Sequence, residues 1–375
     1  NRVNRRLEME HLALYRKYRP KTFEEVIGQD HITKTLANQI LAGKISHAYL
    51  FTGTRGTGKT SIAKIFARAV NCENTKTGSP CGECEVCKRL AQDNDINVVE
   101  IDAASNNKVD DIRELREKVK FAPIGAKYKV YIIDEVHMLS DSAFNALLKT
   151  LEEPPKYVIF ILATTEVHKL PATILSRCVR FDFRLVSVAD LSKLLAKIFD
   201  KEGIKYDAEA LKLIASAGEG SVRDTLSIAD CVNAYSNGNV TKENVLKVLG
   251  TTDYDLLVSF FDKIIQKDIG GMLSLINDMD SNGKNLSVFA KDVSKHARDL
   301  LAIKTCKNPN EILNLPLDVY AKFQEQASTT SEKNLIRYMQ LFSAAESELR
   351  YSLSTRLLLE TTSLSAIMEE EVKKN

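Results

Sequence analysis

The sequence predicts an α/β domain built on a five-stranded parallel sheet, followed by two all-α domains. Between about residues 12 and 183, strand-length runs of Val, Ile, Leu and Phe alternate with segments of helical period, a pattern typical of a parallel sheet covered by helices. A glycine-rich stretch, Gly53–Thr60, separates the first of these runs from a helical segment, as phosphate-binding loops do. After Ser187 the strand signal ends and only helical periodicity continues. We therefore place the α/β domain at residues 12–185, a small helical domain at 186–250 and a second helical domain at 251–375.

Five segments are predicted to be strands because their central residues are almost all apolar, as in strands buried on both faces. They are Ala48–Thr52, Asn97–Asp102, Lys129–Ile133, Tyr157–Ala163 and Cys178–Phe183. Near the end of the chain, apolar residues at helical spacing over Phe342–Ser363 predict one long amphipathic helix. Residues 1–11 begin with Asn rather than Met, so we expect a cloning remnant or a disordered start there.

Composition limits the classes of function. The chain has 375 residues and a formal net charge of +2, so it is long enough for several domains but lacks the bulk positive charge typical of nucleic-acid-binding proteins. No apolar run approaches the roughly 18 residues that a membrane-spanning helix needs, and the sequence has no signal-peptide pattern. These features predict a soluble, cytoplasmic protein without a membrane partner.

The glycine-rich stretch predicts a nucleoside triphosphate site. Gly53 and Gly58 can adopt the positive φ that wrapping the backbone around a phosphate requires. Lys59 then offers a positive charge to the β- and γ-phosphates, and the Thr60 hydroxyl can bind Mg²⁺. The helical segment that follows shows one apolar face, formed by Ile62, Ile65, Phe66, Ala69 and Val70. We assign Gly53, Thr54, Arg55, Gly56, Thr57, Gly58, Lys59, Thr60 and Ser61 to nucleotide binding.

The acidic pair Asp134-Glu135 follows the third predicted strand. In a parallel sheet the carboxyl end of a strand beside the phosphate loop is where a Mg²⁺ ligand lies. We expect Asp134 to hold Mg²⁺ through water and Glu135 to act as the general base that polarises the attacking water. Acidic pairs at strand ends are common without function, and the phosphate loop is what favours the functional interpretation.

Three further positions leave alternatives open. Thr164-Thr165 ends the fourth strand, where a hydroxyl could hold the attacking water, although Thr at a strand end is ordinary. Arg177 precedes the last strand and either pairs with a local carboxylate or reaches a phosphate. Arg223 lies in the first turn of a helix that Ser221 is expected to cap. Its charge opposes the helix dipole, which points to an anionic target, and a plain surface Arg is the alternative.

Four cysteines, Cys72, Cys81, Cys84 and Cys87, lie within sixteen residues and are spaced Cys-x₈-Cys-x₂-Cys-x₂-Cys. Four thiolates can complete a tetrahedral structural zinc site, and the glycines among them allow the tight turns that such a site needs. We expect a zinc module at about residues 72–90.

Basic and imidazole side chains give weaker signals. Lys108, Arg113 and Lys149 are expected near helix starts, where they could hold nucleic-acid phosphates, although most exposed lysines do not. No partner spacing around His47, His137 and His168 suggests catalysis, so we predict core or surface histidines. 

Taken together, four segments resemble bacterial clamp-loader ATPases, which belong to the AAA+ family. They are Gly53–Thr60, Asp134–His137, Leu147–Pro155 and Ser176–Cys178. The cysteine insertion between the phosphate loop and the second strand is similar to a zinc module that the family carries at that place. The resemblance is dense from about Tyr15 to Asp230 and thin afterwards.

This resemblance implies a AAA+ ATPase domain, a helical lid and a helical collar through which subunits assemble into a hetero-oligomeric ring, expected to be pentameric. Thr165 resembles the first sensor and Arg223 the lid sensor, while Arg177 resembles the arginine finger presented in trans to ATP on the neighbouring subunit. Tyr18, Arg19 and Pro20 resemble the segment that lines the adenine side of the pocket. Lys108, Arg113 and Lys149 match positions on the DNA-facing inside of the ring.

The implied function is that of an ATPase within the bacterial DNA polymerase III holoenzyme, a DNA-directed DNA polymerase complex. ATP binding would open a sliding clamp for loading on primer-template DNA, and hydrolysis would release it, with ATP, Mg²⁺ and Zn²⁺ as cofactors. The family's longer form binds polymerase and helicase through a tail that this sequence does not include. Two rival functions remain open: a scaffold subunit that binds ATP without hydrolysis, and another AAA+ motor such as a branch-migration or helicase-loading ATPase.

Overall fold

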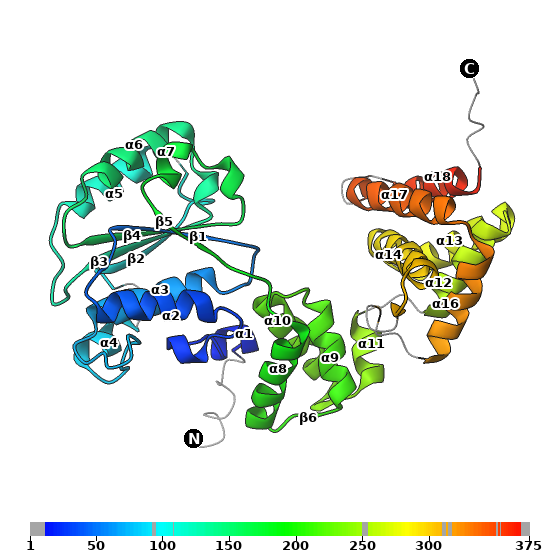
Figure 1. Ribbon diagram of the computed structural model, residues 1–375, viewed down its shortest axis with the longest axis horizontal. Helices are drawn as coiled ribbons and strands as arrows, with labels where there is room; N and C mark the ends of the chain where they lie inside the picture. Colours follow the sequence, from blue (N-terminus) through cyan, green and yellow to red (C-terminus); the bar gives the residue numbers. More distant parts are fainter. Residues whose placement is uncertain are drawn as a thin grey trace, which may run out of the picture. The chain divides into compact units, whose positions relative to one another are not determined.

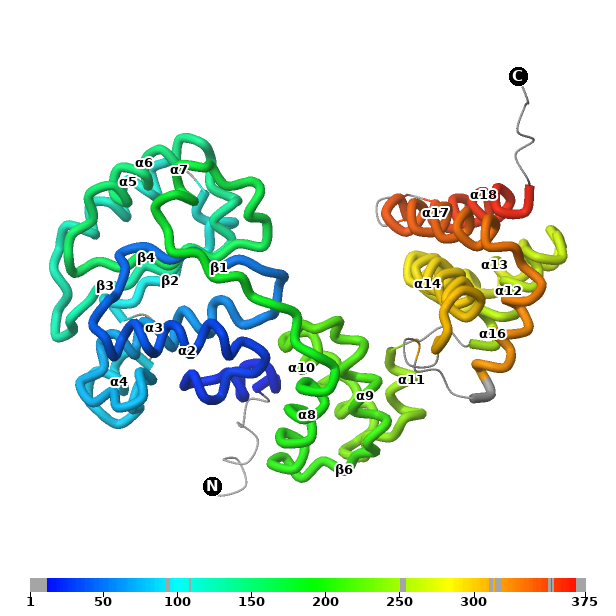
Figure 2. The backbone as a smooth tube through the Cα atoms, viewed as in Figure 1, coloured from blue at the N-terminus to red at the C-terminus, as the bar shows by residue number. Residues whose placement is uncertain are grey.

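The computed structural model describes residues 12–91, 95–107, 109–249, 254–309, 313, 317–349, 352 and 354–368. The chain divides into two compact units, Asn1–Leu249 and Gly250–Asn375. Figures 1 and 2 trace the chain through both units.

The N-terminal unit contains the predicted five-stranded parallel sheet, in the order β2-β3-β4-β1-β5. The strands are β1 (Ala48–Thr52), β2 (Val98–Asp102), β3 (Lys129–Asp134), β4 (Val158–Thr164) and β5 (Val179–Asp182). Thr52 at the end of β1 lies opposite Thr164 on β4 and Asp182 on β5, so these carboxyl ends meet at one edge of the sheet.

Helices cover both faces of this sheet (Figure 1). One face carries α2 (Asp30–Leu41), α3 (Lys59–Asn71) and α4 (Glu85–Leu90), and the other carries α5 (Val109–Val119), α6 (Asp141–Glu152) and α7 (Ala172–Leu175). Alternate residues of each strand enter the two cores: Phe51 packs with α3, whereas Leu50 packs with α5 and α6. This is the arrangement that unbroken apolar strands require.

Helix α3 is buried more widely than its predicted apolar face. Ala63 and Ala67, outside that face, are also fully buried, because α2, α4 and strands β3 and β4 all contact this helix. Small residues at these two positions let the neighbouring elements approach closely, so the helix that begins at the phosphate loop is held on several sides.

A second group of helices completes the N-terminal unit. It contains α8 (Val188–Glu202), α9 (Ala208–Ala217), α10 (Val222–Ser236) and α11 (Lys242–Leu249). The sequence predicted helices only, whereas the structure adds a short parallel pair, β6 (Lys205–Tyr206) and β7 (Asn239–Val240). Short helix α1 (Leu14–Lys17) packs on this group, and the Leu14 N–H donates to Asp230 Oδ2 at 2.6 Å.

The described part of the C-terminal unit is helical. Its helices are α12 (Tyr254–Ile265), α13 (Ile269–Ser281), α14 (Leu286–Thr305), α16 (Leu317–Thr329), α17 (Glu332–Leu349) and α18 (Thr355–Ile367). The prediction of one helix over Phe342–Ser363 is wrong, because α17 ends at Leu349 and α18 begins at Thr355. Ending α17 there lets α18 pack against it, so that Leu349 and Leu359 enter the same core.

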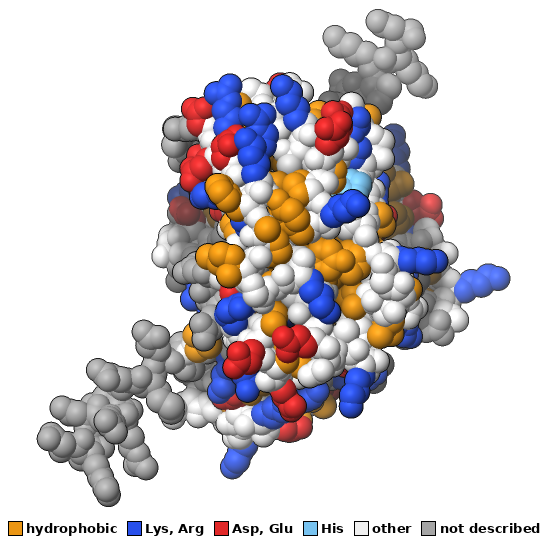
Figure 3. Space-filling view, turned by 90° about the vertical axis from the view of Figure 1, so that its left-hand side faces the viewer, with side chains coloured by type: hydrophobic (Ala, Val, Ile, Leu, Met, Phe, Trp, Pro, Cys, Tyr) orange, Lys and Arg blue, Asp and Glu red, His pale blue; other side chains and the backbone are white. Residues whose placement is uncertain are grey.

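One surface of the molecule is rich in apolar side chains. Figure 3 shows them gathered between charged groups on the side that faces left in Figure 1. Among the exposed apolar residues of the N-terminal unit are Ile96, Phe121 and Ile124, with exposed fractions of 58%, 69% and 67%. Their loops lie side by side, because the Asn97 side chain donates a hydrogen bond to the Ile124 carbonyl oxygen and accepts one from the Ile124 N–H. Apolar surface of this kind often marks a contact with another protein.

No helix among the described residues combines the length and apolar character that crossing a bilayer requires.

Candidate nucleotide-binding site

The glycine-rich loop joins β1 to α3 at the carboxyl edge of the sheet. Gly53 adopts φ +145°, and a Cβ there would lie only 2.6 Å from the Phe183 carbonyl oxygen. Gly58 adopts φ +102° and precedes the first residue of α3, whose free N–H groups and positive dipole end favour a bound phosphate. Both glycines therefore serve the loop shape that the sequence predicted.

Lys59 is the first residue of α3 and is buried, with 6% of its surface exposed. Its ammonium donates to the carbonyl oxygens of Gly53 at 2.7 Å and Thr54 at 2.9 Å. Burial lowers the pKa of Lys59, and the nearby carboxylates of Glu135 and Asp134 act in the opposite direction. The ammonium is thus held inside the loop that would surround the phosphates.

The predicted magnesium ligands lie together. The Thr60 hydroxyl donates to Asp134 Oδ2 at 2.6 Å, which joins the start of α3 to the end of β3. A hydroxyl and a carboxylate are hard oxygen ligands, the kind that Mg²⁺ prefers. The residues therefore fit a magnesium ion that these two side chains would hold, directly or through water.

Glu135 has an unusual backbone conformation for a residue with a side chain. Its φ of +48° lies in the left-handed region, which costs of the order of 1–3 kcal/mol and recurs at active sites. Its Oε2 atom accepts hydrogen bonds from the Thr165 hydroxyl at 3.1 Å and the Thr165 N–H at 3.3 Å. The structure thus brings the predicted base and the predicted sensor into contact.

His137 is a neighbour of Glu135 that sequence reasoning missed. Only 8% of its side chain is exposed, and its Nδ1 lies 3.4 Å from Glu135 Oε2. The same nitrogen lies 3.0 Å from Thr164 Oγ1. The expectation of a core histidine holds for its burial. Its polar partners are Glu135, two residues before it, and Thr164 of β4, 27 residues further along the chain, a contact that spacing alone does not reveal.

The helical group 186–249 contacts the phosphate loop directly. The Gly56 carbonyl accepts a hydrogen bond from the Val222 N–H at the start of α10, at 3.0 Å. Ser221 caps α10 as predicted, accepting from the Asp224 N–H at 3.2 Å. A Cβ on Gly56 would lie 2.0 Å from Ser221 Oγ, so only glycine allows this approach. No sequence motif indicated this contact.

Arg223 and the N-terminal segment lie at the same junction. The exposed Arg223 guanidinium stacks over the Tyr15 ring at 5.3 Å from its centroid. Arg19 Nε donates to the Ser61 hydroxyl at 3.0 Å, and the Tyr18 hydroxyl donates to Glu202. Burial, and then this hydrogen bond, raise the pKa of Tyr18 to about 12. Pro20 follows, half-buried. The segment predicted to line the adenine side therefore joins α3 to the helical group.

Within this chain Arg177 pairs with a local carboxylate, which is the first of its two predicted alternatives. Its guanidinium donates to Glu152 Oε1 at 2.9 Å, and a third of the side chain is exposed. It precedes β5, whereas the phosphate loop follows β1, and these strands are parallel. Arg177 therefore lies at the opposite edge of the sheet from its own chain's loop and cannot serve that loop.

The three residues predicted to face DNA have different outcomes. Lys108 lies outside the described residues. Arg113 lies in the second turn of α5, is largely exposed and forms an ion pair with Asp110 at 2.9 Å. Lys149 is exposed, but the prediction that it lies near a helix start is wrong, because it occupies the last turn of α6. Ser140 caps that helix, which begins at Asp141, eight residues before Lys149.

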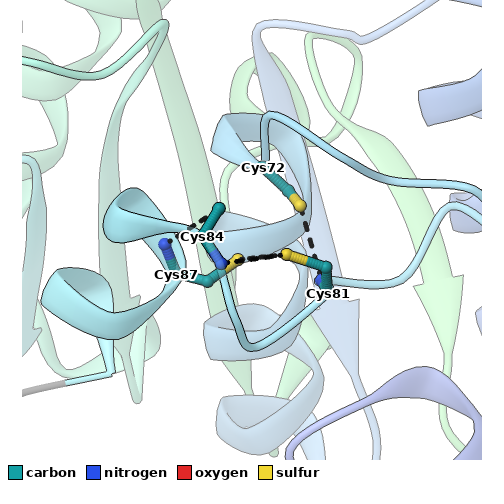
Figure 4. Close-up of side chains that lie close together, drawn as sticks. All are labelled: Cys72, Cys81, Cys84 and Cys87. Atoms are coloured by element: carbon teal, nitrogen blue, oxygen red, sulfur yellow. Dashed lines mark hydrogen bonds between the residues drawn. The ribbon is translucent and has the colours of Figure 1, made fainter.

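The four predicted zinc ligands lie in one cluster (Figure 4). The sulfur atoms of Cys72, Cys81, Cys84 and Cys87 all lie within 4.8 Å of one another. Tetrahedral zinc with Zn–S bonds of about 2.3 Å places sulfurs roughly 3.8 Å apart, and the Cys81 and Cys87 sulfurs are 3.9 Å apart. The cluster therefore fits a zinc ion.

Backbone amides in this cluster are placed to stabilise negative charge on the cysteine sulfurs. The N–H groups of Cys81, Cys84 and Cys87 each donate to a cysteine sulfur at 3.4 Å. Amide donors from Cys84 and Glu83 lower the pKa of Cys81 to about 6, whereas burial raises the pKa of Cys87. A metal would hold all four as thiolates.

Comparison with known families identifies the chain. Residues 28–187 match the family model for the delta subunit of DNA polymerase III, and residues 190–238 match the ATPase lid domain of a DNA polymerase III clamp loader subunit. Residues 240–374 match domain III of the gamma and tau subunits of DNA polymerase III. A Buchnera aphidicola protein, DNA polymerase III subunit gamma, is 42% identical over 275 residues, 73% of this chain and 76% of that protein. The chain belongs to the gamma/tau family.

Longer members of the gamma/tau family are also similar. DNA polymerase III subunit tau of Bacillus subtilis is 44% identical over 94% of this chain, and that of Escherichia coli is 40% identical over 96%. The chain spans 62% and 56% of the length of these two relatives. Membership of the gamma/tau family and the sheet with its helical lid agree with the AAA+ fold that the sequence predicted.

Proposed function

We propose that this chain is the ATP-hydrolysing subunit of a bacterial clamp loader. Residues 12–185 form the ATPase domain, 186–250 the lid and 251–375 the collar through which subunits assemble. ATP binding tightens a ring of subunits so that it opens a sliding clamp, and hydrolysis on primer-template DNA releases the clamp. The protein acts in the bacterial cytoplasm as part of the DNA polymerase III holoenzyme.

The convergence of three segments on one edge of the sheet is the observation that carries this proposal. The phosphate loop supplies Lys59, the end of β3 supplies Asp134 and Glu135, and the end of β4 supplies Thr165. The contacts between Thr60 and Asp134 and between Thr165 and Glu135 bring these segments within hydrogen-bond distance. A triphosphate held by the loop would have its γ-phosphate beside these carboxylates.

Each residue has a distinct role in the proposed reaction. The backbone amides of residues 53–61 and the Lys59 ammonium hold the phosphates, and Thr60 and Asp134 hold Mg²⁺. When bound, the ion neutralises charge on the phosphate oxygens. Glu135 orients the attacking water, Thr165 positions Glu135, and Arg223 reports the nucleotide to the lid. Tyr18, Arg19 and Pro20 line the adenine side.

The site is proposed to be completed by a neighbouring subunit. Arg177 lies at the sheet edge away from its own phosphate loop and is partly exposed, which leaves it accessible to a partner's ATP. An arginine that stabilises the transition-state charge accelerates phosphoryl transfer by about 10³–10⁵. Hydrolysis would therefore depend on assembly.

The remaining partners follow from the family. They are the other subunits of a hetero-oligomeric, pentameric ring, the sliding clamp and primer-template DNA, with Lys108, Arg113 and Lys149 as candidate phosphate contacts. Zn²⁺ held by the four cysteines stabilises the insertion. Polymerase and helicase would bind through the tail of longer family members.

Clamp loading by the assembled complex tests this proposal. The complex is mixed with clamp and primed DNA, and clamps retained on DNA are counted with and without ATP. We expect loading to require ATP and the Lys59→Ala variant to lose at least about 10²-fold of its ATPase rate, as when a preorganised charge is removed. Lys44→Ala, which changes an exposed lysine, should be unaffected. Full loading by Lys59→Ala would refute the assignment.

A further inference from the structure

His137 bridges the predicted catalytic base and an exposed loop. It lies in the short helix η3 (Val136–Met138), directly after Glu135. Its Nδ1 faces Thr164 Oγ1 and Glu135 Oε2, and its Nε2 lies 3.2 Å from Glu166 Oε2. Each ring nitrogen therefore has a polar partner, although the side chain is almost fully buried.

The partners of the two ring nitrogens favour one position of the ring proton. The Glu166 carboxylate, 3.2 Å from Nε2, only accepts hydrogen bonds, whereas the Thr164 hydroxyl, 3.0 Å from Nδ1, can donate as well as accept. Neutral imidazole has one donor and one acceptor nitrogen. Nε2 then carries the proton and donates to the Glu166 carboxylate. Every hydrogen in this chain of groups has an acceptor.

This tautomer constrains Glu135. Because the lone pair of Nδ1 is directed to Thr164, Nδ1 cannot donate to the Glu135 carboxylate 3.4 Å away. This carboxylate therefore keeps the two hydrogen bonds that it accepts from Thr165. If Glu166 moved away, Nε2–H would lose its acceptor, and the tautomer with the proton on Nδ1 would become favourable. In that tautomer Nδ1–H would donate a hydrogen bond to the Glu135 carboxylate and pull it away from Thr165.

Glu166 is placed to respond to its surroundings. Its side chain is 37% exposed and pairs with Lys169 at 2.6 Å in the loop that contains η4 (Val167–Lys169). A cation brought to this loop could compete for the same carboxylate. The left-handed backbone at Glu135 shows that the position of this residue is held by its surroundings against local preference.

We propose that His137 is a positioning residue that couples Glu166 to Glu135, so that the state of the exposed loop sets the orientation of the catalytic base. This inference rests on the proposed function, in which Glu135 orients the attacking water. His137 touches neither nucleotide nor water in this account and acts through Glu135.

A double-mutant cycle tests the coupling. In the assembled complex with clamp and primed DNA, the kcat for ATP and the Kd for a fluorescent ATP analogue are measured for His137→Ala, Glu166→Ala and the double variant. We expect each single change to lower kcat about tenfold to 10²-fold, as when a catalytic group is displaced by about 1 Å, with Kd changed less than about twofold. The double variant should be no slower than His137→Ala, because the two residues act in one chain.

Controls separate this inference from the proposed function. His47→Ala changes an exposed histidine outside this loop and should leave both constants unchanged. If Glu135→Gln hydrolyses ATP at the full rate, the proposed function fails, whatever His137 does. If Glu135→Gln is inactive but His137→Ala keeps full kcat, or if the two single losses multiply in the double variant, the coupling is refuted.

A second variant guards against loss of structure. His137→Gln keeps a polar side chain of similar length that can reach Glu166 but cannot exchange a proton between two nitrogens. If His137→Ala does not bind the ATP analogue, the kcat and Kd of His137→Gln test the coupling instead. Reduced kcat with Kd preserved supports the proposal, and full kcat with Kd preserved overturns it.

Discussion

Glu135 illustrates how local sequence and distant structure combine at a single residue. Its type and place after an apolar strand predicted a catalytic carboxylate, and the structure adds its left-handed backbone and its bonds from Thr165. The carboxylate is therefore held in one orientation before any ligand contributes. Preorganisation of this kind is what allows a general base to act without reorganisation during the reaction.

Replacing this carboxylate should separate binding from hydrolysis. Glu135→Gln keeps the shape of the side chain and its capacity to accept from Thr165, but removes the base. We expect the single-turnover hydrolysis rate to fall by about 10²–10⁴ while the affinity for ATP is retained. Glu153→Gln, which changes an exposed glutamate, is the matched control. Equal loss of ATP binding and hydrolysis would show that Glu135 has a structural role instead.

Residues that depend on local pattern could be predicted, and residues that depend on distant contacts could not. Gly53, Lys59 and the four cysteines belong to short patterns whose spacing fixes their geometry. The Thr164 and Glu166 partners of His137 and the Glu152 partner of Arg177 come from other elements, so no spacing in the sequence predicts these contacts. Single-sequence reasoning therefore proposed Glu135 as the base but missed the histidine that faces it.

At the scale of elements, the contact between the phosphate loop and α10 has the widest consequences. The Gly56 carbonyl bonds the N–H of Val222, and Ser221 lies against Gly56. A ligand that reshapes the loop must therefore act on the first turn of α10. This contact gives a direct physical route from nucleotide to lid.

The cysteine insertion is the element whose stability we expect to depend most on a ligand. Structural zinc contributes of the order of 10–16 kcal/mol to small zinc domains, and this insertion has little apolar core beyond Val86 and Leu90. We expect about one Zn²⁺ per chain by metal analysis and a large loss of zinc in Cys84→Ser. Chelation should lower the thermal unfolding midpoint.

Cys231→Ser provides the control, because Cys231 is exposed and lies outside the cluster. Its zinc content should equal that of the parent protein. A parent protein purified without chelators that contains no zinc, yet keeps an unchanged unfolding midpoint, would contradict the zinc assignment.

The prediction of helices failed where the sequence contains no residue that marks the end of a helix. Apolar residues at helical spacing continue through the break between Leu349 and Thr355, so periodicity alone joined two helices. The five strands, in contrast, were predicted within a residue or two, because turn residues and charges bound each apolar run. The break depends on packing between α17 and α18, and the local pattern of apolar residues does not contain this tertiary contact.

For the molecule as a whole, stability should depend on pH through the core of the C-terminal unit. His296 on α14 is buried between the rings of Phe261 and Phe323. Its Nε2 lies 2.8 Å from Gln326 Oε1. Burial lowers the pKa of His296 to about 4, so the folded core requires the neutral ring.

Acid should therefore weaken this unit. Between the pKa of about 6.5 for an exposed histidine and about 4 in the fold, the unfolded chain binds more protons than the folded chain. Stability consequently falls as pH drops through this window, by about 3 kcal/mol at pH 4. Calorimetric unfolding of the full chain between pH 7 and pH 4 measures this loss.

The variant His296→Gln should remove most of this pH dependence even if it is less stable at pH 7. His168→Gln, which changes an exposed histidine, should retain it. An unfolding profile of the C-terminal unit that is flat across this pH window in the parent protein would contradict the burial of a neutral His296.

The central claim of the account is that ATP is hydrolysed between two neighbouring subunits, one supplying Lys59 and the acidic pair and the other supplying Arg177. Lys59→Ala and Arg177→Ala chains, each inactive alone, can be mixed before assembly into complexes that hold several copies of the chain. A neighbouring pair then joins an intact Lys59 site on one chain to an intact Arg177 on the other. The account predicts that the mixture recovers part of the DNA-stimulated ATPase rate, whereas a mixture no more active than either variant alone would contradict it.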